Sequence, residues 1–348
     1  MQSSKLSRAR ESGLDSRSGH SFRDDRKLGS LKMRVLVTGG SGIVGHYVID
    51  ELYKLGHEVI NADKFRMTSN LGHSGTTGQL ASADAAVKMR KNWPTIPKFF
   101  EVEISDYGQV ISALDGCDAV ISLASRPSAA NYVEEDVVQT NTMSMWNVCR
   151  AAEQLKVRRV ALGSSYNAVG AMGTAARWAR KEVKPPEYFP LDQNVYTRSE
   201  DPYSIAKWLG EEIGEAFSRR SPWMAIASMR FNGMWDDAYF THLQANPITD
   251  PWTRCQGFWT YLHIRDAARA CVQSVTVDND WNGHHRFFLN ANDTMLNIST
   301  MEAIKTVYPE VPLNKEFEGF EAPISTQNVT DVIGWEPIYS WRDERFSS

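Results

Sequence analysis

The feature that most constrains this chain is a glycine-rich turn between a short apolar run and an amphipathic stretch. The run at 35–37 is apolar and rich in β-branched residues, as expected of a strand buried on both faces of a parallel sheet. Glycines follow at positions 39, 40, 42 and 45. Apolar residues then recur at helical spacing from His46 until Gly56, a residue type typical of helix ends. The segment therefore predicts a strand, a turn and a helix, the start of a βαβ unit.

The glycine spacing also predicts a phosphate-binding turn. Gly40 and Gly42 allow backbone angles and close approaches that a Cβ would prevent, and Gly45 lets the helix pack closely on the strand. The amide groups at the helix start then face the pyrophosphate of a dinucleotide. The cofactor-binding residues predicted here are Gly39, Gly42, Ile43, Val44 and Gly45.

An acidic residue follows at the distance expected for a ribose contact. The apolar run at 58–62 ends at Asp63, eighteen residues after Gly45. A carboxylate at this position accepts hydrogen bonds from the ribose hydroxyls and repels a 2′-phosphate. We therefore expect the cofactor to be NAD rather than NADP.

The composition is that of an ordinary globular protein. With 348 residues, 42% hydrophobic and 23% charged, the chain is long enough for one large α/β unit. A net charge of −4 gives no basic surplus for nucleic acid, and no apolar run is long enough to span a membrane. The four cysteines are widely spaced, and Cys149 and Cys271 lie in apolar helical stretches as buried thiols would. We therefore expect a reducing, cytoplasmic setting.

Strands and helices alternate through the first half of the chain, which predicts a parallel sheet with right-handed crossovers. Further strands are expected at 98–104, 118–124, 157–162, 223–229 and 286–290, and helices at 81–91, 106–114, 134–155, 201–219 and 263–275. The predicted class is α/β, a Rossmann-like doubly wound parallel sheet with a smaller C-terminal substrate lobe. The late helix and strand return from this lobe to the main domain.

The domain boundaries follow from changes in composition. Residues 1–32 have too few large apolar side chains to offset the entropy of ordering, so we expect a disordered extension. Residues 33–230 should form the NAD-binding domain, with long insertions at 64–97 and 171–200. Residues 231–348 should mainly form the substrate-binding lobe.

A tyrosine and a lysine lie four residues apart at the start of the helix at 201–219. Tyr203 and Lys207 therefore share one helical face. A nearby ammonium favours the phenolate, so the tyrosine can act as a general base near neutral pH. Ser164 and Ser165 end a predicted parallel strand, and ligands bind at the carboxyl ends of such strands.

Several motifs, in order, resemble those of the extended short-chain dehydrogenase/reductases, specifically the NAD-dependent epimerase/dehydratase group. The resemblance covers about 33–290. In the first half, residues 38–45 resemble the family's TGxxGxxG motif, 103–106 resemble the adenine-pocket segment and include Ile104 and Asp106, and 121–125 resemble the "HLAA" strand end and include Leu123, Ala124 and Ser125. Further along, Asn141 matches a structural asparagine, and residues 164–170, 229–232 and 261–270 resemble "SSxxVYG", "LRxxN" and "YVHVDDVARA".

The resemblance implies a role for each matching residue. Tyr203 would move the hydroxyl proton, Lys207 would hold the nicotinamide ribose, and Ser165 would hydrogen-bond the reacting oxygen, with Ser164 as its alternative. Asn232 would either contact substrate or lie buried, with its side-chain amide hydrogen-bonded to the backbone. Two further residues are expected to be structural, Arg230 paired with a carboxylate at the sheet end and His263 in the core or at its edge.

The implied reaction is hydride transfer between NAD and a carbinol of a sugar or nucleotide sugar. Release of the ketone makes a dehydrogenase, and its re-reduction on the other face makes an epimerase. Dehydration is disfavoured because Tyr166 and Asn167, rather than an Asp-Glu pair, follow Ser165. A non-catalytic NAD-binding regulator and an enzyme of a non-sugar carbonyl stay open as alternatives.

The substrate is the least determined part of the prediction. The insertion before Tyr203 is long and holds Arg177, Trp178, Arg180 and Lys181, which suit an anionic substrate or a solvated turn. The short segment at 232–263 holds Arg254 among Trp235, His242, Trp252, Gln256 and Trp259, which suits a sugar ring with an acidic group or a packed core. A free sugar or sugar acid therefore stays open beside a nucleotide sugar. The expected partner is a sugar-like small molecule, and a homodimer is left open.

Overall fold

The computed structural model describes residues 32–67, 83–127, 132–170, 182 and 184–346. The expected disordered extension lies outside the described residues except for Lys32, as do 68–82 of the first predicted insertion and 171–181 and 183 of the second. The basic residues of the second insertion, at 177–181, are among those outside.

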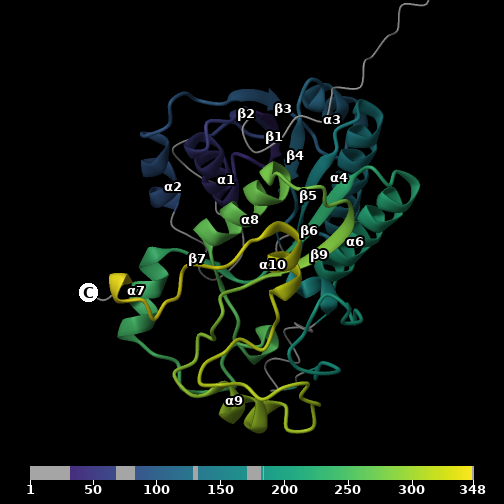
Figure 1. The fold of residues 1–348 in the computed structure, drawn as a ribbon. Coiled ribbons are helices and arrows are strands. Elements are labelled where there is room, and N and C mark those ends of the chain that lie inside the picture. Colours follow the sequence, from purple (N-terminus) through teal and green to yellow (C-terminus); the bar gives the residue numbers. More distant parts are fainter. Residues whose placement is uncertain (1–31, 68–82, 128–131, 171–181, 183, 347–348) are drawn as a thin grey trace, which may run out of the picture.

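A seven-stranded, wholly parallel sheet forms the centre of the molecule (Figure 1). Its strand order is β3-β2-β1-β4-β5-β6-β9, which confirms the predicted doubly wound topology. The strands are β1 (Arg34–Thr38), β2 (Glu58–Asp63), β3 (Lys98–Glu101), β4 (Ala119–Ser122), β5 (Arg159–Ser165), β6 (Ala225–Phe231) and β9 (Gly283–Leu289). Two short strands pair apart from it, β7 (Met234–Trp235) and β8 (Leu262–His263).

Helices cover both faces of the sheet and bury its apolar side chains. Helices α1 (Ile43–Lys54), α8 (Ile264–Thr276) and α10 (Gln327–Ile333) share one hydrophobic cluster, and α3 (Tyr107–Leu114), α4 (Glu134–Leu155) and α6 (Pro202–Arg220) share the other. Helix α2 (Ala83–Arg90) contacts α1. The two groups of helices lie on opposite sides of the strands in Figure 1.

The predicted elements are present, with shifted ends. Helix α4 has the predicted bounds, and Asp201 caps α6 by accepting a hydrogen bond from the Ser204 amide at 3.0 Å. Strand β5 ends at Ser165, as predicted, and β6 runs to Phe231, beyond its predicted end at 229, since the last residues of the two strands pair in register. Strands β3 and β4 are shorter than predicted.

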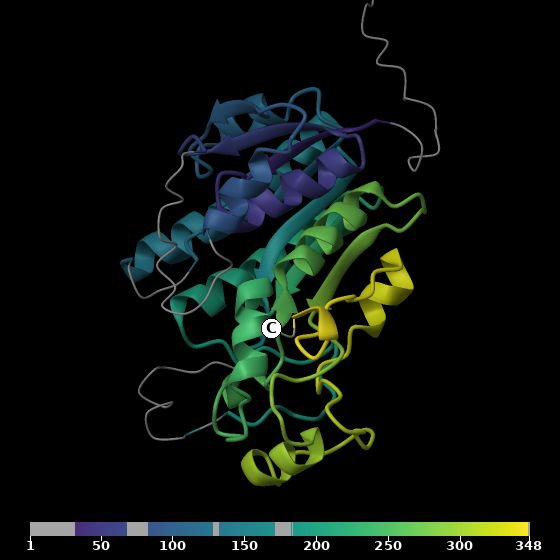
Figure 2. The same ribbon diagram turned by 90° about the vertical axis from the view of Figure 1, so that its left-hand side faces the viewer.

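A third hydrophobic cluster lies mostly beyond the sheet and its covering helices, and Phe288 of β9 joins it to the sheet. It gathers side chains from 169–195, 235–261, 288–311 and the C-terminal segment, and two helices that were not predicted, α7 (Asp237–Ala245) and α9 (Thr300–Val307), contribute to it. Helix α9 lies at the opposite end of the molecule from β3 and α3 (Figures 1 and 2). Trp235 and Trp259 are buried in this cluster, so these two aromatic residues are core rather than an open ligand surface.

Three further observations concern the cysteines, membrane-spanning helices and metal-binding groups. All four cysteines are buried and unpaired, as expected for Cys149 and Cys271. Within the described ranges, no helix is both long and apolar enough to cross a bilayer. Over the same residues, no group of three His, Cys, Asp or Glu side chains is arranged to hold a metal ion.

Candidate active site

The glycine turn follows β1 directly and is tightly packed. Gly39 has φ +69°, and a Cβ there would lie 2.6 Å from the Ala124 amide nitrogen. A Cβ on Gly45 would lie 2.5 Å from the Cα of Gly40, so the first turn of α1 sits directly on the loop. Gly42, by contrast, would meet only the Gly39 carbonyl, at 3.2 Å, and its φ is an ordinary −75°. The constraint therefore lies mainly at Gly39, Gly40 and Gly45 rather than at Gly42.

Helix α1 begins without a side-chain cap. Gly42 occupies the N-cap position and can offer no side-chain acceptor to the amides of the first turn. Gly42 is exposed, and Ile43 and Val44 are partly exposed. An uncapped helix start beside a close-packed glycine turn fits the pyrophosphate of a dinucleotide.

Asp63 lies next to this turn, at the end of β2. Its Oδ2 accepts a hydrogen bond from the Ser41 amide at 3.0 Å, and its Oδ1 accepts one from the Phe65 amide at 3.3 Å. Burial raises the pKa of this carboxyl, and the backbone hydrogen bonds oppose the rise. The position matches that of the predicted ribose-binding acid.

The other predicted cofactor residues lie along the neighbouring strand ends. The Leu123 amide donates to the Thr38 carbonyl at 3.0 Å, and the Ala124 amide donates to Thr38 Oγ1 at 3.3 Å. Ser125 follows them and is partly exposed. Ile104 is buried, with its carbonyl accepting from Asn147 Nδ2 at 3.1 Å.

Asp106 has a local structural role in addition to the cofactor role predicted for it. Its Oδ1 caps α3 by accepting from the Gln109 amide at 3.0 Å, and its Oδ2 accepts from Gln109 Nε2 at 3.3 Å. The residue itself is exposed.

The structure brings the three predicted catalytic residues together. Ser165 ends β5, and its hydroxyl hydrogen-bonds the phenol of Tyr203 in the first turn of α6. The Lys207 ammonium lies 5.5 Å from the centre of the Tyr203 ring and donates to the Gly163 carbonyl at 2.6 Å. The end of β5 and the start of α6 therefore form one polar centre at the carboxyl edge of the sheet.

Burial dominates the protonation of this centre. Burial raises the pKa of Tyr203 to about 12, and the hydrogen bond from Ser165 opposes that rise. The expected lowering of the phenol pKa by Lys207 is therefore not what this structure shows, because desolvation penalises the phenolate more than Ser165 stabilises it. Burial also lowers the pKa of Lys207 to about 8, and the charge of Glu211 opposes that change.

Ser164 does not share the position of Ser165. Its Oγ donates to Glu211 Oε1 at 2.6 Å, so its hydroxyl is committed to a buried carboxylate. Arg230 donates to the same carboxylate through Nε at 3.0 Å and Nη2 at 2.8 Å, which confirms that it pairs with a carboxylate. Glu211 was not predicted, although it lies four residues after Lys207 and therefore shares its helical face.

The remaining predicted polar residues are held within the fold. Asn232 is buried, with Oδ1 accepting from Thr260 Oγ1 at 2.7 Å and Nδ2 near the Leu289 carbonyl at 3.4 Å, which favours the buried-amide alternative. Asn141 clamps the segment after β4, since its side chain both donates to and accepts from the Arg126 backbone, at 3.1 and 2.7 Å. His263 is buried and caps α8, in agreement with the expected structural role.

Tyr166 connects Arg254 with the centre formed by Ser165, Tyr203 and Lys207, because Arg254 and Tyr203 both act on its phenol. Burial raises the pKa of Tyr166, while the charge of Arg254 lowers it and Tyr203 adds a smaller upward effect. The Arg254 guanidinium lies 5.7 Å from the centre of the Trp235 ring. The Tyr166 hydroxyl would be 3.2 Å from a Cβ on Gly257, so the loop around 254–257 closes over this tyrosine.

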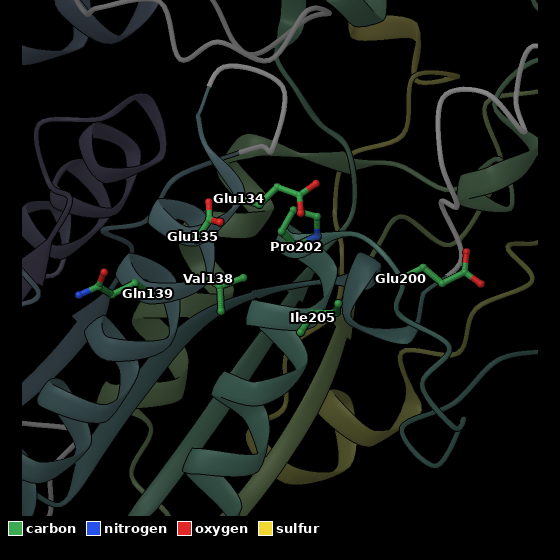
Figure 3. A pocket seen from close by; sticks show the side chains of 7 residues that line it. All are labelled: Glu134, Glu135, Val138, Gln139, Glu200, Pro202 and Ile205. Atoms are coloured by element: carbon green, nitrogen blue, oxygen red, sulfur yellow. The ribbon is translucent and has the colours of Figure 1, made fainter.

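A separate pocket of about 500 Å³ opens between the first turns of α4 and α6 (Figure 3). It is lined by Glu134, Glu135, Val138, Gln139, Glu200, Pro202 and Ile205. Its described lining does not include Ser165, Tyr203 or Lys207, so this pocket lies on a different face of α6 from the predicted catalytic side chains.

The fold and the glycine turn are those of a Rossmann-like, dinucleotide-binding protein. Residues 35–234 match the NAD dependent epimerase/dehydratase family. The chain belongs to this family, which consists of enzymes and uses NAD as its cofactor.

Individual relatives are distant. A UDP-N-acetyl-alpha-D-glucosaminuronate decarboxylase of Bacillus cytotoxicus is 28% identical over 188 residues, which cover 53% of this chain and 49% of the relative. A UDP-glucose 4-epimerase of Yersinia enterocolitica is 24% identical over 204 residues, which cover 57% of this chain and 53% of the relative. The chain thus spans about half the length of the curated relatives it matches.

The likeness to solved structures extends further along the chain. The structure of a UDP-glucose-4-epimerase from Stenotrophomonas maltophila, with bound NAD and formylated UDP-arabinopyranose, superposes with a TM-score of 0.62 at 17% identity. The match covers 89% of this chain and 94% of that one. At this identity the match shows a shared fold.

Proposed function

We propose that this protein is an NAD-dependent oxidoreductase or epimerase that acts on a hydroxyl of a nucleotide sugar. The observation that supports it most is the hydrogen bond between Ser165 and Tyr203 with the Lys207 ammonium one helical turn away. The names of the relatives, which include UDP-glucose 4-epimerases, support a nucleotide sugar over a free sugar.

Each residue of the centre has a distinct task in this proposal. Ser165 holds the reacting oxygen, and Tyr203 takes its proton in the oxidative direction and returns it in the reductive direction. Lys207 supplies positive charge behind the phenol and holds the nicotinamide ribose. The amides at the start of α1 and the Asp63 carboxylate bind the pyrophosphate and the adenosine ribose. NAD, when bound, supplies the hydride acceptor.

The test is a screen for turnover with NAD against nucleotide sugars, free sugars and uronic acids. A lasting NADH absorbance indicates a dehydrogenase, and an isomeric product without net NADH indicates an epimerase. Turnover should fall by about 10²–10⁴-fold in Tyr203→Phe, the range of a lost general acid–base. Tyr196→Phe, which changes a tyrosine that is 69% exposed, serves as the matched control. A Tyr203→Phe enzyme with parental turnover contradicts the assigned mechanism.

A sugar acid dehydrogenase is the second candidate. It is favoured by Arg254, whose charge acts on Tyr166 beside the catalytic tyrosine. A guanidinium there can pair with a substrate carboxylate. In this case uronic acids should be turned over in preference to neutral sugars, and Arg254→Gln should raise KM for the acid while leaving that for neutral sugars unchanged.

A further inference from the structure

A fully buried carboxylate lies on α6 one helical turn after the lysine of the proposed centre. Glu211 is on α6, four residues after Lys207 and eight after Tyr203, so the three side chains follow one face of the helix. The Glu211 side chain is 0% exposed. A buried charge of this kind is costly unless it is compensated by partners.

The partners of Glu211 come from three strands of the sheet. Ser164 on β5 donates at 2.6 Å, Arg230 on β6 donates through two nitrogens at 3.0 and 2.8 Å, and the Arg286 Nε on β9 lies 3.3 Å away. Ser164 and Arg230 are also paired in register across the two strands. Glu211 therefore fastens α6 to the strand end that carries Ser165 and the Gly163 carbonyl.

The charged groups packed against Glu211 from the sheet are basic. β6 and β9 bring Arg230 and Arg286 to its carboxylate, and the neighbouring His284 on β9 lies against Glu215. The two other α6 carboxylates are engaged elsewhere, Glu212 with Arg286 at 3.0 Å and Glu215 with His284 at 3.2 Å. Glu211 is the carboxylate whose charge acts on Lys207.

We propose that Glu211 is a positioning residue for the reaction, which keeps the buried Lys207 ammonium charged and in place beside Tyr203. The proposal rests on the proposed function for its catalytic meaning, but the state of Lys207 can be measured without a substrate. Arg230 and Ser164 hold the Glu211 carboxylate in its place, so these hydrogen bonds fix the helical turn of α6 that follows Lys207.

The direction of the effect follows from the two opposing influences on Lys207. Burial already lowers the pKa of Lys207 to about 8, and Glu211 acts against burial. Without the carboxylate, the pKa of Lys207 falls further, and the lysine loses its proton near neutral pH. The enzyme should then lose activity on the alkaline side of its pH profile at a lower pH than the parent.

The experiment is an NMR titration of the Lys207 side chain in protein labelled with ¹³C at lysine Cε. The signal is assigned with Lys207→Arg. In Glu211→Gln, the Lys207 midpoint should fall by at least one pH unit, a tenfold loss of proton affinity. Glu212→Gln, which removes a neighbouring and 46% exposed carboxylate, should leave the midpoint unchanged. An unchanged midpoint in Glu211→Gln overturns the proposal.

A second variant separates this effect from loss of folding. Glu211→Gln leaves Arg230 buried without its partner, whereas Glu211→Gln combined with Arg230→Met removes both charges of the pair. The double variant should regain thermal stability. Because Arg230→Met also removes a positive charge, the Lys207 midpoint of the double variant should lie above that of Glu211→Gln, and a midpoint below that of Glu211→Gln contradicts the proposal. If the parent shows no turnover in the substrate screen, the proposed function fails, while the titration still decides the role of Glu211.

Discussion

At the scale of single residues, Asp63 shows how backbone hydrogen bonds fix the orientation of a carboxylate. Its two oxygens accept hydrogen bonds from the backbone amides of Ser41, in the glycine turn, and of Phe65, just beyond β2. These bonds hold the carboxylate against the turn, where it would meet the adenosine ribose of a bound dinucleotide. The same negative charge would repel a 2′-phosphate.

The substitution Asp63→Asn should therefore change the choice of cofactor. We expect the ratio of NADP to NAD affinity to rise by about 10–100-fold, which corresponds to about 1.4–2.8 kcal/mol of relieved repulsion. Binding calorimetry with each cofactor measures this ratio. The matched control is Asp50→Asn on α1, since Asp50 pairs with Lys54 and not with the turn. An unchanged ratio in Asp63→Asn would show that this carboxylate does not select the cofactor.

The residues at the end of β5 and the start of α6 also show how far sequence could predict a site. The strand-end position of Ser165 and the helical spacing of Tyr203 and Lys207 were predictable because each is a local pattern, and their catalytic roles stay predictions. Glu211 was not predicted, because its role depends on Ser164 and Arg230, whose proximity arises only once β5, β6 and α6 are packed.

At the scale of elements, α4 and α6 pack along each other on one face of the sheet and are joined near their C-terminal ends. Glu153 in the last turn of α4 accepts from Arg220 Nε at 2.8 Å and from Ser221 Oγ at 2.5 Å. The hydrogen bond from Arg220 lowers the pKa of Glu153. A depressed carboxyl pKa means that the folded state gains stability above the ordinary glutamate value of 4.5 and loses it as the pH falls through the lower, folded value.

Glu153→Gln should accordingly destabilise the protein by about 1 kcal/mol at pH 7, as expected for charge-assisted bonds at a partly exposed site. The difference from the parent should shrink below pH 4.5 and vanish once Glu153 is protonated in the folded parent. Urea unfolding at several pH values measures both. Glu310→Gln, at an exposed position, is the control. A difference that stays constant with pH would contradict the assigned role.

Elements inside the alternating first half of the chain were predicted whatever their length, whereas the short helices α7 and α9 of the less regular second half were not. Helix α4 was predicted with its bounds because its 22 residues have a long amphipathic pattern and a Pro-free, acidic start. Helix α9 has only 8 residues and was missed, although Ser299 caps it by accepting from the Glu302 amide at 3.2 Å, a visible capping pattern.

At the scale of the whole molecule, one strand joins the sheet to the third hydrophobic cluster. In β9, Phe287 belongs to the hydrophobic cluster that α1 and α8 share, and its neighbour Phe288 belongs to the third hydrophobic cluster. Successive side chains of a strand point to opposite faces, so β9 is a shared wall of two cores. We expect the described body to unfold as one unit rather than as two separate lobes.

This predicts that Phe288→Ala and Phe287→Ala destabilise the same transition. Each should lower the free energy of unfolding by about 3–5 kcal/mol, because both side chains are at most 2% exposed. Calorimetry should show one heat-absorption peak for the parent and for both variants. A Phe288→Ala protein with two separated peaks, the first at a lower temperature, would show that the C-terminal part is an independent domain.

The position of β9 in the sheet has a consequence for how the protein is made. β9 pairs with β6 along its whole length, yet it comes after α7, β7, β8 and α8 in the chain. At the translation rate of about 5–20 residues per second, the ribosome needs several seconds to advance from Phe231 to Leu289. During that interval the free edge of β6 presents unpaired amides and carbonyls on the nascent chain, which is the condition under which chaperones bind and edge-to-edge aggregation begins.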